Sequence, residues 1–381
     1  MRKYKLRELL TIKNGCDYRH LSTGSVPVYG SGGFMCFVNQ AMSNKPSILL
    51  PRKGTLNNIM FIDKPFWTVD TMYWSEIKED IVEPYYLYNY LKVLKFDGIR
   101  TGSTLPSMTS SAYYDIPVIL PDYNKQTRVA NILKLLNNKI ELNNKINQEL
   151  EQMAKTLYEY WFVQFDFPDE KGRPYKSANG KMVYNEVLKR EIPDGWEVKN
   201  IFDVLDIQYG YPFNTELFTG NKGYSVVRIR DILTNSISAH TVEKADGKYK
   251  LHEGDLLIGM DGNFHMNYWN ETGAYLNQRC VRIRCKKGTP LSVIQAKYSL
   301  EPFIKKREQN ISRTTVGHLS DKDFKSQYIL VPKINPYFNP KKAFECILYK
   351  ITNNNNEIKK LVSLRDFLLP LLMNGQVSVQ C

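Results

Sequence analysis

Two segments of the chain carry apolar residues at the spacing of a long α-helix. Between Leu133 and Trp161, and again between Phe344 and Leu372, mostly apolar residues, with a few polar ones among them, recur in steps of three and four positions. A seam with a mean period near 3.5 residues is typical of a coiled coil. Neither segment is apolar enough on all sides to form a core helix. We therefore expect each helix to pair with the other.

The expected seam contains an asparagine at a matching place in each helix. Asn143 and Asn354 stand near the middle of their segments, where a polar seam residue lowers stability but fixes the register of the pair. Pro370 is expected to kink or end the second helix, because proline has no backbone N–H and clashes with the preceding turn. The residues expected to pair the helices are Leu136, Ile140, Asn143, Leu150 and Leu157 in the first and Ile347, Ile351, Asn354, Leu361 and Leu368 in the second.

The two helices belong to an internal repeat. A shift of 211 positions (315 − 104) carries Thr104 to Thr315 and, without a gap, Leu157 to Leu368. Upstream, residues 10–15 match residues 205–210 with a shift of 195. Residues 48–50 match residues 256–258 with a shift of 208, as insertions in loops would produce. The chain therefore consists of two copies of one unit, which are related by a pseudo-two-fold axis if the helices run antiparallel.

Each unit begins with a segment rich in predicted strands. Short β-branched and aromatic runs are separated by turn dipeptides, and they fall at residues 47–50, 59–62, 224–229, 255–258 and 280–284. This pattern predicts an α/β (α+β) fold with a twisted sheet in each unit. A polar segment rich in glycine, proline and lysine joins the units and is expected to hold a small hairpin around Asn179 and Gly180.

These observations predict two strand-rich domains joined by two long helices that form an antiparallel coiled coil. The expected boundaries are 1–121 for the first domain, 122–164 for the first long helix, 165–193 for a linker, 194–332 for the second domain and 333–375 for the second long helix.

Charge favours a polyanionic partner. The chain of 381 residues has a formal net charge of +13 and a pI of about 9.2. A protein that binds nucleic acid and an ordinary basic enzyme can both carry such a charge. Mean hydropathy is −0.41, and no apolar run suggests a membrane span or a leader, so we expect no membrane partner and a cytoplasmic location. The six cysteines are scattered without a paired spacing, so no metal site or disulfide framework is expected.

No segment supplies a convincing catalytic site. The glycine-rich residues 30–33 are not followed by a helix-opening sequence, so a tight turn is favoured over a methyltransferase cofactor loop. Residues 335–338 lack the second proline of an amino-methyltransferase loop and are expected to form a linker turn and helix entry. Asp63 with residues 76–78 has roughly the spacing of a metal-dependent nuclease, but Glu-x-Lys recurs elsewhere in the chain. We expect no catalytic residue, no cofactor and no bound metal.

Candidate DNA-binding residues gather on predicted turns. Arginine can bond guanine, asparagine or glutamine can bond adenine and aspartate can accept from cytosine, while lysine, serine and threonine chiefly hold phosphates. The turn at residues 101–104, which ends in Thr104, and its counterpart in the second unit can equally cap helices that start near Ser107 and Ser320. The candidates are Lys13, Arg19, Arg52, Lys53, Asn57, Asn58 and Thr104 in the first unit and Arg228, Arg230, Asp261, Asn263, Gln278, Arg279, Arg313, Thr314 and Thr315 in the second.

The chain resembles the specificity subunit of type I restriction–modification systems along nearly its whole length. The most specific stretches are LNNKINQEL at 142–150, LYEYWFV at 157–163, GKMV at 180–183, REIPDGW at 190–196 and LRDFLLPLLMNG at 364–375. The resemblance implies two target-recognition domains that each read one half of a bipartite, asymmetric duplex DNA site. It also implies that the paired helices dock two modification (methyltransferase) subunits, that restriction subunits join later, and that methylation and cleavage reside in those partners.

Two other classes of function remain as alternatives. A DNA-modifying enzyme would fuse methyltransferase or nuclease chemistry to one recognition domain, but the two copies leave no third segment for catalysis. A purely structural coiled-coil adaptor would show no salt-dependent affinity for DNA, whereas a protein that contacts phosphates loses affinity steeply as salt rises.

Overall fold

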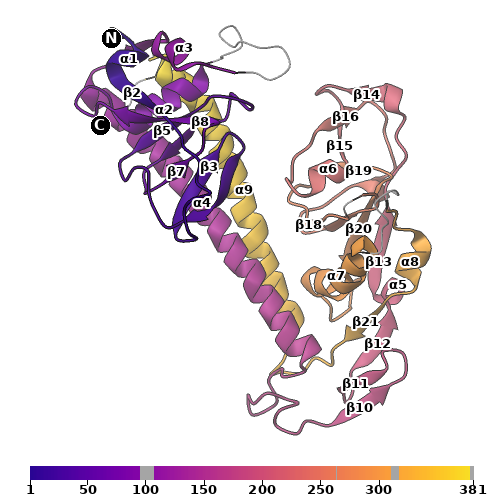
Figure 1. The fold of residues 1–381 in the computed structure, drawn as a ribbon. Helices are drawn as coiled ribbons and strands as arrows, with labels where there is room; N and C mark the ends of the chain where they lie inside the picture. The colour runs from indigo at the N-terminus through magenta and orange to yellow at the C-terminus, as the bar shows by residue number, and fades with distance from the viewer. Residues whose placement is uncertain (95–106, 263, 310–316, 378–381) are drawn as a thin grey trace. The chain divides into compact units, whose positions relative to one another are not determined.

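The computed structural model describes residues 1–94, 107–262, 264–309 and 317–377. The chain divides into two compact units, one made of Met1–Glu141 with Lys360–Cys381 and the other of Leu142–Lys359. Each unit therefore contains a strand-rich domain and one end of each long helix (Figure 1).

The first unit is built from one four-stranded sheet, two smaller sheets and short helices. The four-stranded sheet is antiparallel, in the order β2 (Leu10–Asn14), β8 (Met72–Ile77), β5 (Ser47–Pro51), β6 (Met60–Ile62). A second sheet has the order β4 (Gly33–Val38), β3 (Val26–Gly30), β7 (Trp67–Thr68), and β3 and β7 run parallel. The remaining elements are the pair β1 (Arg2–Lys5) and β9 (Pro117–Leu120) and the helices α1 (Leu6–Leu9), α2 (Pro84–Val93) and α3 (Ser110–Tyr114).

The second unit repeats this plan. Its antiparallel sheet has the order β13 (Leu205–Tyr209), β20 (Cys280–Cys285), β17 (Leu256–Gly259), β18 (Met266–Tyr268). The other sheet has the order β14 (Phe218–Thr219), β16 (Ala239–Thr241), β15 (Tyr224–Val227), β19 (Tyr275–Leu276). The further elements are β12 (Glu197–Asn200) paired with β21 (Tyr328–Val331), the hairpin of β10 (Met182–Asn185) and β11 (Arg190–Pro193), and the helices α5 (Ile201–Val204), α6 (Ile229–Ile232), η2 (Thr215–Leu217), η3 (Gly247–Tyr249), α7 (Val293–Gln309) and α8 (Asp321–Lys325).

The strand registers confirm the internal repeat. Arg2 of β1 lies opposite Leu120 of β9, and Glu197 of β12 lies opposite Val331 of β21, which are the same places after shifts of 195 (197 − 2) and 211 (331 − 120). The parallel pairing of β3 with β7 likewise recurs in β15 with β19. Two domains with the same four-stranded antiparallel sheet are therefore present, as the sequence predicts, while β14 adds a fourth strand to the other sheet of the second unit.

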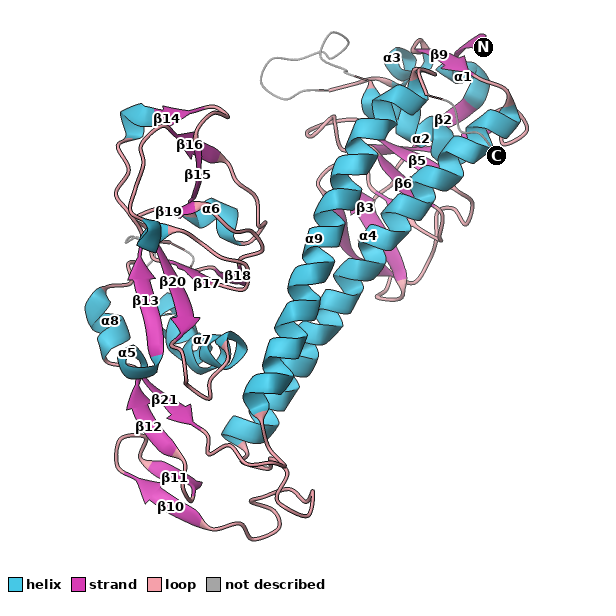
Figure 2. Ribbon diagram, turned by 180° about the vertical axis from the view of Figure 1, so that it is seen from behind, coloured by secondary structure: helices cyan, strands magenta, loops and turns pink. Residues whose placement is uncertain are grey.

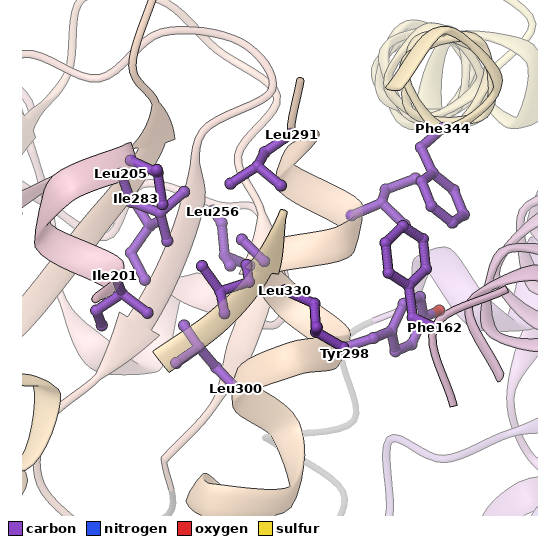
Figure 3. Packing of buried hydrophobic residues seen from close by; sticks show 14 of the residues in the cluster. Phe162, Ile201, Leu205, Leu256, Ile283, Leu291, Tyr298, Leu300, Leu330 and Phe344 are labelled. Carbon is purple, nitrogen blue, oxygen red and sulfur yellow. The ribbon is translucent and has the colours of Figure 1, made fainter. Parts of the chain in front are cut away.

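Apolar runs in the sequence become the buried centre of each domain. All five residues of β5 and all four of β17 are buried, because both strands lie inside their sheets and are covered on both faces. In the second unit, Figure 3 shows Leu205, Leu256 and Ile283 from the sheet packed with Leu291, Leu300 and Leu330.

The long helices are α4 (Tyr123–Tyr158) and α9 (Pro340–Met373). A π-helix, η1 (Glu159–Val163), extends α4. In the second unit Asn147 of α4 hydrogen-bonds Asn355 of α9, and in the first unit Asn137 of α4 accepts from Arg365 of α9 at 3.0 Å. A lower number on α4 thus meets a higher number on α9, so the two helices run antiparallel and side by side (Figure 2).

Each domain is fastened to α4 by an ion pair. In the first unit, Lys134 of α4 lies 2.9 Å from the nearly buried carboxylate of Glu83, which also caps α2. In the second unit the charges are exchanged, since Glu151 of α4 lies 3.3 Å from Lys297 of α7. The Tyr298 hydroxyl adds a hydrogen bond to the Glu151 carbonyl at 2.9 Å. The coiled coil and the domains are therefore joined by specific polar contacts as well as by apolar packing.

Of the two outcomes expected at Pro370, the structure excludes an end of the second long helix there. This helix continues through Pro370 to Met373. It begins at Pro340 because Asn339 caps it through the Lys342 N–H, and the preceding residues 335–338 form a turn in which the Asn335 side chain accepts from two backbone N–H groups.

Two shorter predictions were wrong in detail. The linker hairpin is formed by β10 and β11, while Asn179, at a φ of 64°, closes a turn in which the Gly180 N–H bonds the Tyr175 carbonyl. The strand expected at 224–229 ends at Val227, because Arg228 begins the cap of α6. The helices expected to start near Ser107 and Ser320 are α3, which follows the cap Thr109, and α8, which follows the cap Ser320.

Candidate nucleic-acid interface

In the first unit, the candidate residues after β5 lie on one loop. This loop turns at Gly54, where φ is +87°, a conformation that favours glycine. The Arg52 carbonyl accepts from the Met108 N–H at 3.0 Å, and Lys53 forms an isolated backbone bridge with Ser107. The Arg52 guanidinium lies over the Tyr73 ring, and the Lys53 side chain is exposed. The fold thus exposes the Lys53 side chain to solvent and holds the Arg52 guanidinium against the Tyr73 ring.

Two other candidates on this loop, Asn57 and Asn58, differ in where their side chains lie. Asn57 is exposed and can reach a ligand. Asn58 donates from its side chain to the Ser31 carbonyl at 2.8 Å, so it joins the loop to the turn at 30–33. This contact gives Asn58 a structural part in holding the two turns together.

Lys13 and Arg19 are exposed but paired with carboxylates. Lys13 pairs with Glu76 across β2 and β8 and lies over the Trp74 ring. Arg19 is 82% exposed and lies 2.9 Å from Asp17. The hydrogen bond from Arg19 lowers the pKa of Asp17 to about 2, because it stabilises the ionised carboxylate. Because a phosphate would compete with these exposed carboxylates, both cations remain available to DNA.

The second unit forms a cluster at the equivalent place. Asp261 makes an isolated backbone bridge with His318, which corresponds to the Lys53–Ser107 bridge after shifts of 208 and 211. Asp261 Oδ2 lies 3.2 Å from Arg279 Nε, and Oδ1 lies 2.6 Å from His318 Nδ1. Gly262, at a φ of +70°, repeats the turn at Gly54. Gln278 is exposed beside Arg279, whose carbonyl accepts from the Met260 N–H at 2.9 Å.

The structure therefore brings Asp261, Gln278 and Arg279 together on adjoining turns. It also adds Ser107 and His318, which sequence reasoning did not select. The signal for both was present in the repeat, since they are related by the same shift of 211 (318 − 107) that relates Thr104 to Thr315. Four candidates of the second unit, Asn263, Arg313, Thr314 and Thr315, and Thr104 of the first lie outside the described residues.

Arg228 and Arg230 lie around Ser238. Arg228 donates to the Ser238 carbonyl and hydroxyl at 2.9 and 3.0 Å, and Arg230 Nε donates to the same hydroxyl at 3.1 Å. Burial, together with the charge of Arg230, lowers the pKa of the Arg228 guanidinium from its ordinary value. Arg228 is thus partly committed to internal contacts, whereas the Arg230 residue is exposed.

The side chains considered for catalysis do not form a catalytic site within the described residues. Among these residues there is no group of three or more histidine, cysteine or carboxylate side chains that could hold a metal ion. Glu76 of the nuclease-like spacing pairs with Lys13, and Asp63 is exposed. Burial raises the pKa of the Cys280 thiol to about 12, which makes it a poor nucleophile. Within the same described ranges, no helix has the length and apolar character that crossing a membrane requires.

Comparison with known proteins identifies the family. A family model for the type I restriction modification DNA specificity domain matches residues 1–152 and 193–361. The chain belongs to this family. The two matched ranges cover the two copies of the repeat, and each includes a strand-rich domain and residues of the long helix that follows it.

Relatives with this role share most of the chain. It is 27% identical over 359 residues to the type I restriction enzyme MjaIX specificity subunit of Methanocaldococcus jannaschii, covering 88% of this chain and 78% of the relative. It is 22% identical over 367 residues to the HindI specificity subunit of Haemophilus influenzae, covering 79% of each chain. These relatives support a non-catalytic specificity subunit and do not support the alternative of a fused modifying enzyme.

A solved structure shows the same fold. The type I restriction–modification S subunit from M. genitalium superposes with a TM-score of 0.63 at 16% identity, and the match covers 97% of this chain and 95% of the other. The two-domain repeat is therefore the fold of a specificity subunit.

Proposed function

We propose that this specificity subunit reads a bipartite, asymmetric duplex DNA site, with one half read by each unit. The observation that carries the proposal is the pair of equivalent bridges, Lys53–Ser107 and Asp261–His318. Their backbones match, but one carries a lysine and a serine and the other an acid and a histidine. Different donors and acceptors on equivalent turns suit two different base sequences.

Within this proposal the side chains divide into two roles. Gln278 and Arg279 of the second unit and Arg52 and Asn57 of the first are proposed to contact base edges, because amide and guanidinium groups can bond bases in two places. Lys13, Arg19, Lys53 and Arg230 are proposed to hold phosphates, which fix the register without reading sequence.

The long helices are proposed to hold the spacing between the two half-sites and to dock partners. The helix α4 has 36 residues, about 54 Å at 1.5 Å per residue. Large apolar residues of α4 are exposed in each unit, Leu135 at 70% in the first and Leu142 and Met153 at 52% and 54% in the second, and they are proposed as contacts for partners. We infer that two modification subunits dock on the helices and that restriction subunits join them.

The domain boundaries implied by this role are 1–121 and 194–332 for the recognition domains, 122–164 and 333–375 for the helical spacers, and 165–193 for the linker. A protein that works on the DNA of its host acts where that DNA lies, so the cytoplasm is the proposed location.

A binding experiment tests the proposal directly. The subunit is assembled with its modification subunits, and its affinity for duplex DNA is measured over a range of salt concentrations. We expect affinity to fall steeply with salt, and Lys53→Ala to reduce the slope by about one unit. The matched control is Lys176→Ala in the linker, also exposed, which should leave the slope unchanged. Affinity that is independent of salt would instead favour a structural adaptor.

A further inference from the structure

An exposed aromatic pair stands on β4 of the first unit. Phe34 and Phe37 are 55% and 50% exposed, and their ring centroids are 4.9 Å apart. Met35 between them is 47% exposed. Three large apolar residues in one short strand are costly to leave in water, so the patch is expected to meet an apolar ligand.

A β-bulge creates this patch. Cys36 lies opposite Val28 and Phe34 lies opposite Tyr29, so Met35 is an extra residue in the ladder. Side chains alternate between the faces of a strand, and without the bulge Phe34 would point away from Phe37. Because bulges turn side chains toward new directions, the extra residue is what places the two rings together.

The patch adjoins the candidate DNA-binding loop. The turn at 30–33 that leads into β4 is held to this loop by the hydrogen bond from Asn58 to the Ser31 carbonyl. Thr71 ties the same two segments, since its hydroxyl accepts from the Ser31 N–H at 3.3 Å and its carbonyl accepts from the Arg52 N–H at 2.8 Å. Phe34 and Met35 also line a pocket with Arg19 and its partner Asp17. The apolar patch thus shares a pocket with one candidate phosphate-binding cation, Arg19, and adjoins the loop that carries two more, Arg52 and Lys53.

The second unit has different chemistry at the matching place. Phe37 lies opposite Pro27, and the equivalent position opposite Ser225 is His240. The segment after β15 that corresponds to the turn at 30–33 carries Arg228 and Arg230. The aromatic pair is therefore a property of the first unit.

We propose that Phe34 and Phe37 read thymine 5-methyl groups in the half-site of the first unit, an inference that rests on the proposed function. The major groove admits a two-stranded ribbon such as β3–β4, and phenylalanine is a suitable apolar contact for the thymine methyl. Insertion between base pairs fits less well, because two rings inclined at 55° cannot both lie flat between parallel bases.

The test uses the subunit assembled with its modification subunits and a duplex that carries its mapped target. Each thymine is replaced in turn by deoxyuridine, which lacks only the 5-methyl group. We expect at least one replacement in the half-site of the first unit to weaken binding about fourfold, the effect of losing one buried methyl contact. Phe34→Ala and Phe37→Ala should weaken binding to the thymine duplex and remove the discrimination. Tyr184→Ala, an equally exposed aromatic on β10, should keep it.

Several results would overturn the inference. They are a half-site without thymine, binding that is indifferent to every replacement there, or a Phe34→Ala variant that still discriminates fourfold. The replacements on DNA need no protein variant, so misfolding cannot imitate them. Failure of the proposed function would give another result. The complex without any amino-acid substitution would then bind its target no more tightly than unrelated DNA.

Discussion

Asn143 donates a hydrogen bond from Nδ2 to the Glu357 carboxylate at 2.9 Å, between the two long helices. Asn143 is only 1% exposed. Next to it, Asn354 donates to the side chain of Asn147, which in turn donates to Asn355. The middle of the seam is therefore polar and specifically paired, in the place where the sequence puts an asparagine on each helix.

Replacing Asn143 by alanine should destabilise this pairing. The variant removes a partner of the Glu357 carboxylate, and the expected loss is about 1–3 kcal/mol of unfolding free energy. Urea unfolding followed by circular dichroism measures it. Asn144→Ala changes an exposed neighbour and should have little effect, so equal stability of the two variants would contradict a structural role for the buried amide.

Two equivalent glycines should resist substitution. A Cβ at Gly15 would lie 2.1 Å from the Val69 carbonyl oxygen, and a Cβ at Gly210 would lie 1.9 Å from that of Asn277. Because both neighbours are backbone atoms, the strands must move. We therefore expect Gly15→Ala and Gly210→Ala each to lower the free energy of unfolding by about 1–3 kcal/mol or more. Gly32→Ala meets nothing within 4 Å and is the control in thermal unfolding. If Gly210→Ala unfolded at the same temperature as this control, the close approach would be wrong.

Arg279 should affect only the half-site of the second unit. Its guanidinium is held by Asp261 on an exposed turn, so Arg279→Ala should cost about 1–3 kcal/mol of discrimination at one base position. Competition binding with single-base variants of the target locates that position. Arg173→Ala, an exposed arginine of the linker, should leave the preference intact. An equal loss at every position would assign Arg279 to phosphate binding instead.

Exchanging residues 1–121 for another recognition domain should alter one half of the target. Each domain has its own core clusters and its own fastening to α4, so the second domain should keep its preference. Sequencing of methylated sites in cells that carry the hybrid shows the outcome. A change in both halves would mean that the domains do not read independently.

Shortening the helical pair should shorten the unread spacer. The deletion removes one heptad from residues 137–150 and the matching heptad from 348–361, so the seam keeps its period. Both half-site sequences should persist, closer together, when the variant's target is mapped. An unchanged spacer would refute the role of the helices in setting the spacing.

The sequence predicts the repeat and the helices well because packing imposes them. Gly15 and Gly210 must lack a side chain, and the apolar positions of α4 and α9 must face one another, so both leave a regular pattern. Of the expected pairing residues, Asn143, Ile347 and Ile351 are buried, while the half-buried ones are Leu136, Ile140, Leu150, Leu157, Asn354, Leu361 and Leu368.

Surface features are harder to predict. The bulge at Met35 depends on strand register, so its exposed aromatic pair cannot be recognised from alternation alone. The repeat relates His318 to Ser107, but its place beside Asp261, 57 positions away in sequence, becomes visible only in the structure. The choice of reading residues is therefore the part that the sequence constrains least, because exposed turns are not fixed by packing.

The central claim is that two unlike readers on one chain define one split target. Genome-wide mapping of methylated sites, in a host that expresses this chain with its modification subunits, tests it most directly. The account predicts a site of two unequal specific halves separated by a fixed number of unread bases. A continuous recognition sequence, two identical halves, or methylation without sequence preference would contradict it.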